Sequence, residues 1–135
     1  YFTGQMRPNL GAAVDFDISS TGTIFILYSD GVMTSYFGGE AQSFAFSGFP
    51  QGQELSGTTV QGLYLNDSPI TPGFYIVSQA TRTIYETTLA GTFVNSYRVF
   101  DEDMLALLSD VVADPGQDMI YAASGNGIVA LSRQD

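Results

Sequence analysis

The chain has 135 residues, of which 44% are hydrophobic and 13% aromatic, and this length and composition support one folded domain with a sizeable core. Its 14 acidic residues outnumber 4 basic residues, giving a formal net charge of -10, which disfavours nucleic acid and anionic lipid surfaces as partners. Cysteine and histidine are both absent, which excludes disulfides, thiolate metal sites and the commonest general base.

The first predicted unit begins with three β-rich segments between Phe16 and Met33. Its second segment, 24–28, is apolar and is too short to span a bilayer, so no membrane insertion is expected. Asp30-Gly31 favours the positive φ angles of a type I′ hairpin turn. A fourth strand is predicted at 42–46, and the stretch 47–57, with its glycines and proline, reads as a long surface loop.

The second predicted unit has strands at 62–65, 74–77, 83–87 and 92–99. Its first turn is longer, and Gln79 to Arg82 replaces the tight turn of the first unit. The segment 101–108 begins with an Asp that can cap a helix and has acidic residues in its first turn, so a short helical connector is expected there.

The third predicted unit repeats the first, because 112–129 aligns without gaps on 16–33 at a spacing of 96 residues. Asn126-Gly127 takes the place of Asp30-Gly31. Four antiparallel strands in roughly 40 to 50 residues are typical of a β-propeller blade. We therefore expect one domain, 1–135, with repeats at about 12–48, 58–100 and 108–135. Matching alternation predicts burial for Phe16, Ile24, Ile26, Phe74, Ile76, Val112 and Ile120.

Two runs of the sequence look like blades of NHL-type and related six-bladed, TolB-like propellers: Asp114-Pro115-Gly116-Gln117-Asp118-Met119-Ile120-Tyr121-Ala122-Ala123, and Phe74-Tyr75-Ile76-Val77 through Ile84-Tyr85 to Leu89-Ala90-Gly91-Thr92-Phe93. The resemblance implies an all-β protein of about three four-stranded antiparallel blades, part of a six-bladed ring. A β-sandwich is the alternative, although it does not explain two gapless copies. Since a closed propeller requires at least four blades, about half a ring is expected. The rest of a longer chain, a second copy of this chain, or its first residues would cover the open faces.

Polar residues at the ends of the first strands are the places to look for a site. Resemblance to calcium-bearing six-bladed hydrolases makes Asp17, Asn66 and Asp114 candidate calcium ligands, since calcium prefers carboxylate and amide oxygens. The competing interpretation is that such short side chains cap turns through the backbone. The loop candidates for binding a partner are Asp30, Arg82 and Asn126, and no residue is assigned a catalytic role.

The sequence favours a non-catalytic binding or scaffolding segment of a larger or oligomeric protein, with a protein or a small ligand as partner. A homo-oligomer that completes the ring fits this hypothesis. The alternatives are part of a calcium-dependent six-bladed hydrolase or lactonase, and a structural cell-surface module. The compartment stays open, with an extracellular or periplasmic setting favoured.

Overall fold

All the regular elements of the described residues are β-strands, which confirms the all-β prediction. The computed structural model describes residues 12–52, 54–55, 57–69, 72–98, 108–114, 116–125 and 127–132. The strands are β1 (Ala13–Ile18), β2 (Ile24–Tyr28), β3 (Met33–Phe37), β4 (Glu40–Gln42), β5 (Gly62–Asn66), β6 (Gly73–Ser78), β7 (Thr83–Thr87), β8 (Phe93–Tyr97), β9 (Leu108–Asp114), β10 (Met119–Ser124) and β11 (Gly127–Ser132).

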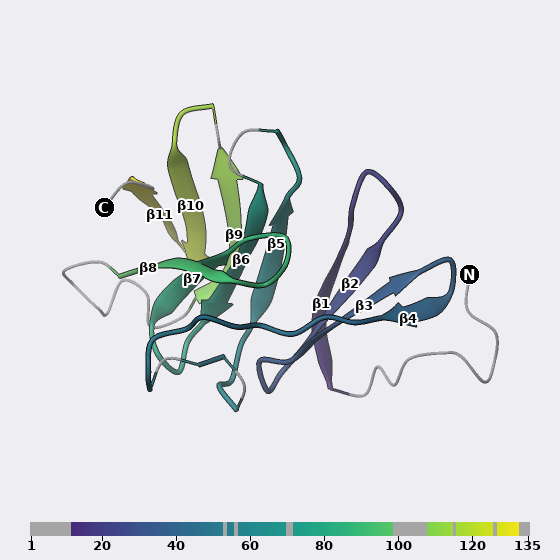
Figure 1. Cartoon of the computed structure of the whole chain (residues 1–135). Coiled ribbons are helices and arrows are strands. Elements are labelled where there is room, and N and C mark those ends of the chain that lie inside the picture. The colour runs from purple at the N-terminus through teal and green to yellow at the C-terminus, as the bar shows by residue number, and fades with distance from the viewer. Residues whose placement is uncertain are drawn as a thin grey trace.

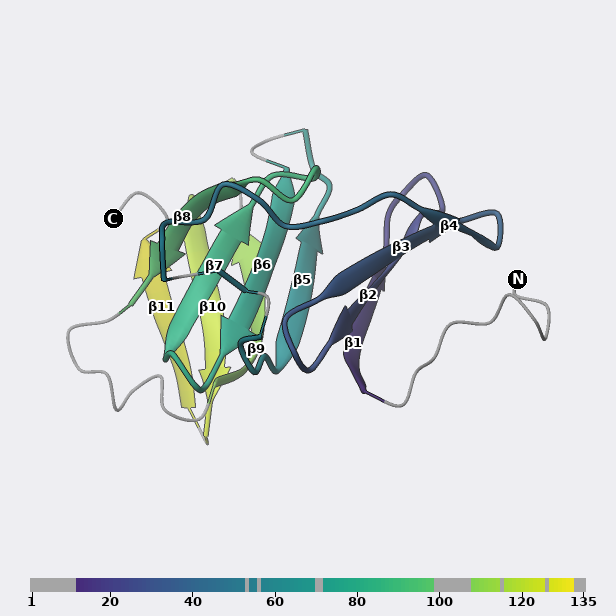
Figure 2. The same ribbon diagram turned by 60° about the horizontal axis from the view of Figure 1, so that its bottom comes forward.

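The strands form three antiparallel sheets, each made of consecutive strands (Figure 1). We call them the first sheet (β1 to β4), the middle sheet (β5 to β8) and the last sheet (β9 to β11). The initial strands of the sheets meet, because β1 contacts β5 and β5 contacts β9. The sheets therefore follow one another as propeller blades do, with the middle sheet between the other two (Figure 2), rather than as the two facing layers of a sandwich. In the described residues the last sheet has three strands, whereas the first and middle sheets have four each.

The core consists of two apolar clusters, one on each side of the middle sheet. Phe25 and Leu27 from β2 pack with Phe74 and Ile76 from β6 between the first and middle sheets. On the other side of β6, Tyr75 and Val77 pack against residues of the last sheet. Both faces of β6 and β7 are buried, which explains why these strands show no alternation of apolar and polar residues.

The predicted burial is correct for Ile26, Phe74, Ile76 and Ile120, while Ile24 is half-buried. The prediction is wrong for Phe16 and Val112, which are 62% and 47% exposed. β1 turns Asp15 and Asp17 toward the middle sheet, and therefore turns Phe16 outward.

The repeat alignment is out of register by one residue in the initial strands. Phe16 pairs with Ile26, whereas Val111, not Val112, pairs with Ala122, the residue that the alignment matches to Ile26. The chain between β9 and β10 is one residue shorter than between β1 and β2. A shift of one residue moves a side chain to the opposite face of a sheet, so Val112 also points away from the core.

Strand pairs do flank both predicted hairpin turns, but the turns differ from the prediction. At Asp30-Gly31 only Gly31 has a positive φ, of 83°, and Gly31 donates its N–H to Tyr28 O. This is a type I turn with a glycine bulge rather than the predicted type I′ turn. In the other hairpin Gly125 has the positive φ and Gly127 already pairs with Ser124, so the turn lies one residue earlier than predicted. Asn126 lies outside the described residues.

The first sheet has a fourth strand, as predicted, but the predicted bounds, 42–46, are wrong. β4 ends at Gln42, and the phenylalanines that follow leave the sheet and pack against the core between the first and middle sheets, which removes apolar surface from water. The predicted helical connector, 101–108, lies outside the described residues except for Leu108, which begins β9. The first residues of the chain, proposed as a cover for the last blade, also lie outside them.

Candidate functional site

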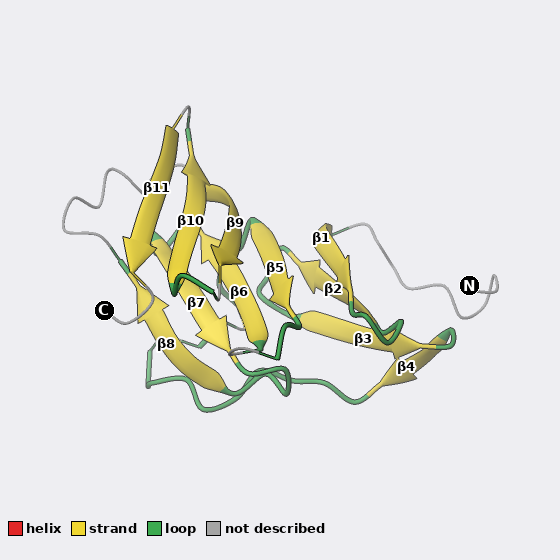
Figure 3. Cartoon of the chain, turned by 90° about the horizontal axis from the view of Figure 1, so that it is seen from above, coloured by secondary structure: helices red, strands yellow, loops and turns green. Residues whose placement is uncertain are grey.

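The segment after β4 runs from the first sheet to the outer strand of the middle sheet (Figure 3). There Ser47 forms a parallel bridge with Thr92. Ser47 donates its N–H to Gly91 O at 2.9 Å and accepts the N–H of Phe93 at 2.8 Å. The backbone hydrogen bonds fix this segment against the middle sheet, although it belongs to no sheet of its own.

Three phenylalanines of this segment join the side chains of the first and middle sheets. Phe44 makes edge contacts with Phe25 and Phe74, each at a ring-centroid distance of 5.9 Å. Phe49 lies 5.0 Å from Phe93 by the same measure, and Phe46 lies between Phe44 and Phe49 in the series. Such edge and tilted contacts between rings are favourable, so these rings hold the segment over the boundary between two sheets.

A pocket opens between these phenylalanines and the turn that joins β2 to β3. Its volume is about 340 Å³, and its lining consists of residues 31–33, 44–49, 54 and 55. We call it the aromatic pocket. Ligand pockets of proteins begin at roughly 300 Å³ and are lined mainly by apolar groups. The aromatic pocket is mainly apolar, and its volume lies near the lower end of this range.

Glu54 and Leu55 form the part of the pocket lining that follows the phenylalanines. Backbone hydrogen bonds from the residues after them hold this part next to the β2–β3 turn. Gly57 donates its N–H to Asp30 O at 2.7 Å, and Val60 donates its N–H to Ser29 O at 3.1 Å. Leu55 is buried under these contacts. A Cβ atom on Gly31 would lie 1.8 Å from Leu55 O, so only glycine allows the turn and this wall to approach so closely.

The charged side chain in the pocket lining is acidic. Glu54 is exposed and lines the pocket, and Asp30 is exposed next to the lining residue Gly31. Among the described residues, no basic side chain belongs to the lining. An apolar group with a positive charge beside it would therefore match the pocket better than an anionic group.

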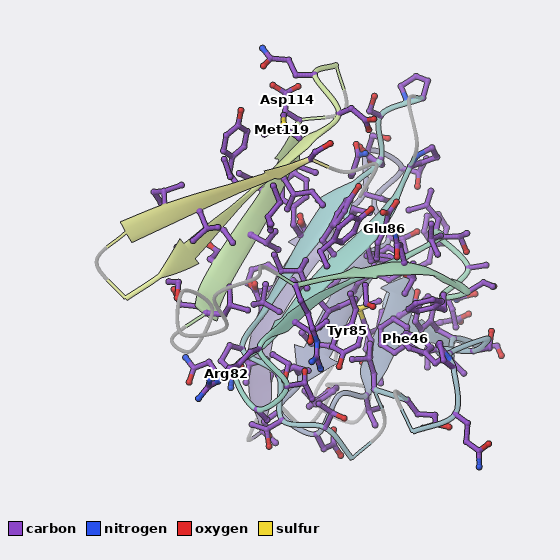
Figure 4. The ribbon with its side chains drawn as sticks, turned by 90° about the vertical axis from the view of Figure 1, so that its left-hand side faces the viewer. Phe46, Arg82, Tyr85, Glu86, Asp114 and Met119 are labelled. Carbon is purple, nitrogen blue, oxygen red and sulfur yellow. The ribbon has the colours of Figure 1, made fainter. Side chains whose placement is uncertain are left out.

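The structure does not bring the three candidate calcium ligands together in one site. Asp17 accepts the N–H of Leu65 on β5 at 3.0 Å, while the neighbouring Asn66 is buried and accepts the N–H of Ser68. Asp114, on β9, accepts the N–H of Gly116. Figure 4 shows Asp114 beside Met119, at the end of the last sheet and away from Phe46. In the described residues no group of three His, Cys, Asp or Glu side chains is placed to hold a metal ion.

The two loop candidates that the structure describes, Asp30 and Arg82, lie in separate hairpin turns. Asp30 is at the rim of the aromatic pocket and caps its own turn by accepting the N–H of Val32. Arg82 is half-buried with a positive φ of 52° in the turn between β6 and β7, and Figure 4 places it away from Asp114. Of these two described candidates, only Asp30 is therefore near the pocket.

The sequence interpretation did not single out the phenylalanines at 44, 46 and 49, or Glu54, as residues that line a pocket. The signal available was a cluster of aromatic residues inside a stretch rich in glycine. An irregular segment has no reason to keep large apolar side chains unless they pack against something.

Across the described part of the chain, no helix is long and apolar enough to cross a membrane.

The fold is similar to that of a known β-propeller, although the sequence has no match. No family model and no curated protein matches the chain. The WD40 domain of Pan2 from Neurospora crassa matches its structure with a TM-score of 0.62 and 17% sequence identity. The match covers 92% of this chain and 36% of that domain. The chain has a β-propeller fold spanning about a third of that domain's length, and the match does not single out the NHL or TolB-like type.

Proposed function

We propose that the chain is a non-catalytic, protein-binding segment of a propeller, and that its aromatic pocket receives an apolar side chain from a partner. The observation that carries this proposal is a pocket of about 340 Å³, lined by phenylalanines that pack against the first and middle sheets. Binding sites on propellers are formed by segments that a rigid scaffold positions. Residues 43–52, 54 and 55 are positioned in this way by the first and middle sheets.

The charge at the pocket selects the chemistry of the partner. Glu54 lines the pocket, Asp30 is beside it, and the whole chain has a net charge of -10. A peptide segment with a Phe or Leu next to an Arg or Lys combines the apolar group with the complementary charge. The pocket is too small for more than one or two such side chains, so a single short contact is expected to bind weakly.

The test uses two capped dipeptides and amide chemical shifts of the chain measured by NMR. N-acetyl-Phe-Arg-amide is expected to shift the amide signals of residues 31–33, 44–49 and 54–55 saturably, and N-acetyl-Phe-Glu-amide to shift them several-fold less. Ala45→Trp, which adds a large ring at an exposed lining position and is designed to occupy the pocket, is expected to abolish the shifts. Glu54→Gln is expected to reduce the difference between the two peptides.

The control is Phe37→Ala, which removes an exposed phenylalanine outside the pocket lining and is expected to leave the shifts unchanged. Shifts that spread evenly over the surface, or that survive Ala45→Trp, would show that the pocket is not the binding site. Equal binding of both dipeptides would contradict the proposed preference for a basic partner.

We also propose that the blades belong to a six-bladed ring of the NHL or TolB-like kind. The support is the spacing of 96 residues between the first and third units, with a second unit midway. In the initial strands, β1 and β9, the structure differs from this alignment by one residue. Electron microscopy of the complete assembly would count the blades, and a count other than six would overturn this part of the proposal.

A further inference from the structure

Two faces of the stacked sheets carry apolar side chains that no sheet of the described residues covers. On the outer face of β1, Val14, Phe16 and Ile18 are 39%, 62% and 52% exposed. On the outer face of the last sheet, Val112 and Ile128 are 47% and 72% exposed. The equivalent positions inside the stack are in the buried clusters. Apolar surfaces of this kind mark places where another molecule docks.

The contact between β1 and β5 shows how one blade recognises the next. Asp15 accepts two backbone N–H groups: that of Phe16 at 2.8 Å through Oδ1 and that of Leu63 at 2.9 Å through Oδ2. Asp17 does the same with Ile18 and Leu65. β1 and β5 are edge strands of their sheets, so their outward N–H groups have no strand partner. Each of these two carboxylates therefore accepts one N–H from the edge strand of the first sheet and one N–H from the edge strand of the middle sheet.

β9 has half of this arrangement on its outer face. Asp110 accepts the N–H of Val111 at 2.8 Å through Oδ1, as Asp15 does with Phe16. Val111 and Ala113 face the middle sheet, so the alternation of the strand turns Asp110 and Val112 outward. β9 therefore presents a carboxylate beside an apolar residue to whatever follows it.

The outer face of β1 is the matching half. Val14, Phe16 and Ile18 face the side from which a preceding blade would approach, as Leu63 and Leu65 of β5 face the first sheet. The chain thus has both complementary surfaces of one blade contact, one at each end of its stack. We infer that the outer face of the last sheet docks on the outer face of the first sheet of a second copy, continuing the stack across two chains.

This pairing joins two different surfaces, so it can extend indefinitely or close into a ring. Two copies contribute six sheets, and a closed dimer would cover all four outer faces at once. Each copy has a net charge of -10, so long-range repulsion opposes association and salt is expected to weaken that repulsion. The inference is independent of the aromatic pocket, which lies between the first and middle sheets of one chain.

Single-cysteine variants test the pairing directly, because the chain has no cysteine of its own. Phe16→Cys and Val112→Cys are mixed in equal amounts and oxidised gently, and a disulfide-linked heterodimer is expected. Val94→Cys is the matched control, since Val94 is 45% exposed on β8, away from both end faces. It is expected to cross-link to neither variant. Cross-linking of all pairs to the same extent would overturn the inference.

Sedimentation equilibrium supplies a second readout. The unmodified chain is expected to form dimers that strengthen as salt is raised. Phe16→Glu or Val112→Glu is expected to raise the dimer dissociation constant by at least about tenfold, while Val94→Glu leaves it unchanged. All three side chains are exposed, so circular dichroism should show unchanged folding. A chain that stays monomeric at high concentration, or dimers as sensitive to Val94→Glu as to the other two, would refute the docking.

Discussion

Tyr97 donates its hydroxyl to the buried carboxylate of Glu86, at an oxygen-to-oxygen distance of 2.6 Å. Both residues belong to the middle sheet, on neighbouring strands β8 and β7, and they are 4% and 2% exposed. A buried carboxylate is tolerated in a core only while hydrogen-bond donors surround it.

Tyr97→Phe removes this donor and leaves the ring in place. We expect the free energy of unfolding to fall by about 1–3 kcal/mol, because the carboxylate stays buried with one donor fewer. Urea denaturation followed by circular dichroism measures the change. Tyr64→Phe is the control, since the half-buried Tyr64 packs against the same cluster without a hydrogen bond from its hydroxyl in the described residues. A loss of equal size in both variants would mean that the Glu86 contact is unimportant.

Asp17→Ala removes the acceptor of two backbone N–H groups, on Ile18 and Leu65. Because the second of these lies in another sheet, we expect a loss of about 1.5–3 kcal/mol in the free energy of unfolding. Asp114→Ala is the comparison, since Asp114 accepts the N–H of the exposed Gly116 within one turn, and a loss below about 1 kcal/mol is expected there. Equal losses would show that Asp17 does not join the two sheets.

Gly31→Ala and Gly22→Ala separate backbone strain from steric overlap. Both glycines have a positive φ, of 83° and 92°. A Cβ at Gly31 would overlap Leu55 O, whereas a Cβ at Gly22 would meet no atom within 4 Å. We expect Gly22→Ala to cost about 1 kcal/mol and Gly31→Ala about 3 kcal/mol or more. Thermal unfolding gives the two values, and a smaller cost at Gly31 would place Leu55 elsewhere.

Phe49→Ala tests whether the segment after β4 is held by its aromatic contacts. Phe49 packs against Phe93 and Tyr85, and its loss is expected to cost about 1–2 kcal/mol and to loosen the segment. Chymotrypsin should then cut near Phe44 and Phe46 several-fold faster than in the unmodified chain, as followed by mass spectrometry. Phe37→Ala, at a residue 53% exposed, should leave the cleavage rate unchanged. Cleavage that is already fast in the unmodified chain would contradict the described packing.

Local sequence signals were sufficient to predict the strand pairs β2–β3 and β6–β7. The apolar run 24–28 and the turn at Asp30-Gly31 predict the β2–β3 hairpin, and the strands predicted at 74–77 and 83–87 lie within β6 and β7. These strands are paired with their neighbours in the chain. Their identity therefore depends on residues close in sequence, which a pattern can report.

The direction in which β1 faces could not be predicted in the same way. Val14, Phe16 and Ile18 alternate with Asp15 and Asp17, and such a pattern normally turns the apolar residues inward. Here the carboxylates face the neighbouring sheet because backbone N–H groups of β5 require acceptors. That requirement exists only in the assembled stack, since it arises from a strand 48 residues away in the chain.

The aromatic pocket escaped prediction for a related reason. Phe44-Ala45-Phe46 alternates as a strand does, and nothing nearby in the chain indicates a different conformation. Its partners, Phe25 and Phe74, come from two different sheets. Only their meeting creates the apolar surface on which Phe44 packs.

The order of the strands has a consequence for how the chain folds. Since every sheet consists of consecutive strands, each can form from its own short stretch, and local contacts of this kind favour fast folding. The first sheet can assemble during synthesis before the others exist. The bridge between Ser47 and Thr92 must wait until the middle sheet has been made. Weakening it is therefore expected to speed unfolding while leaving the folding rate nearly unchanged.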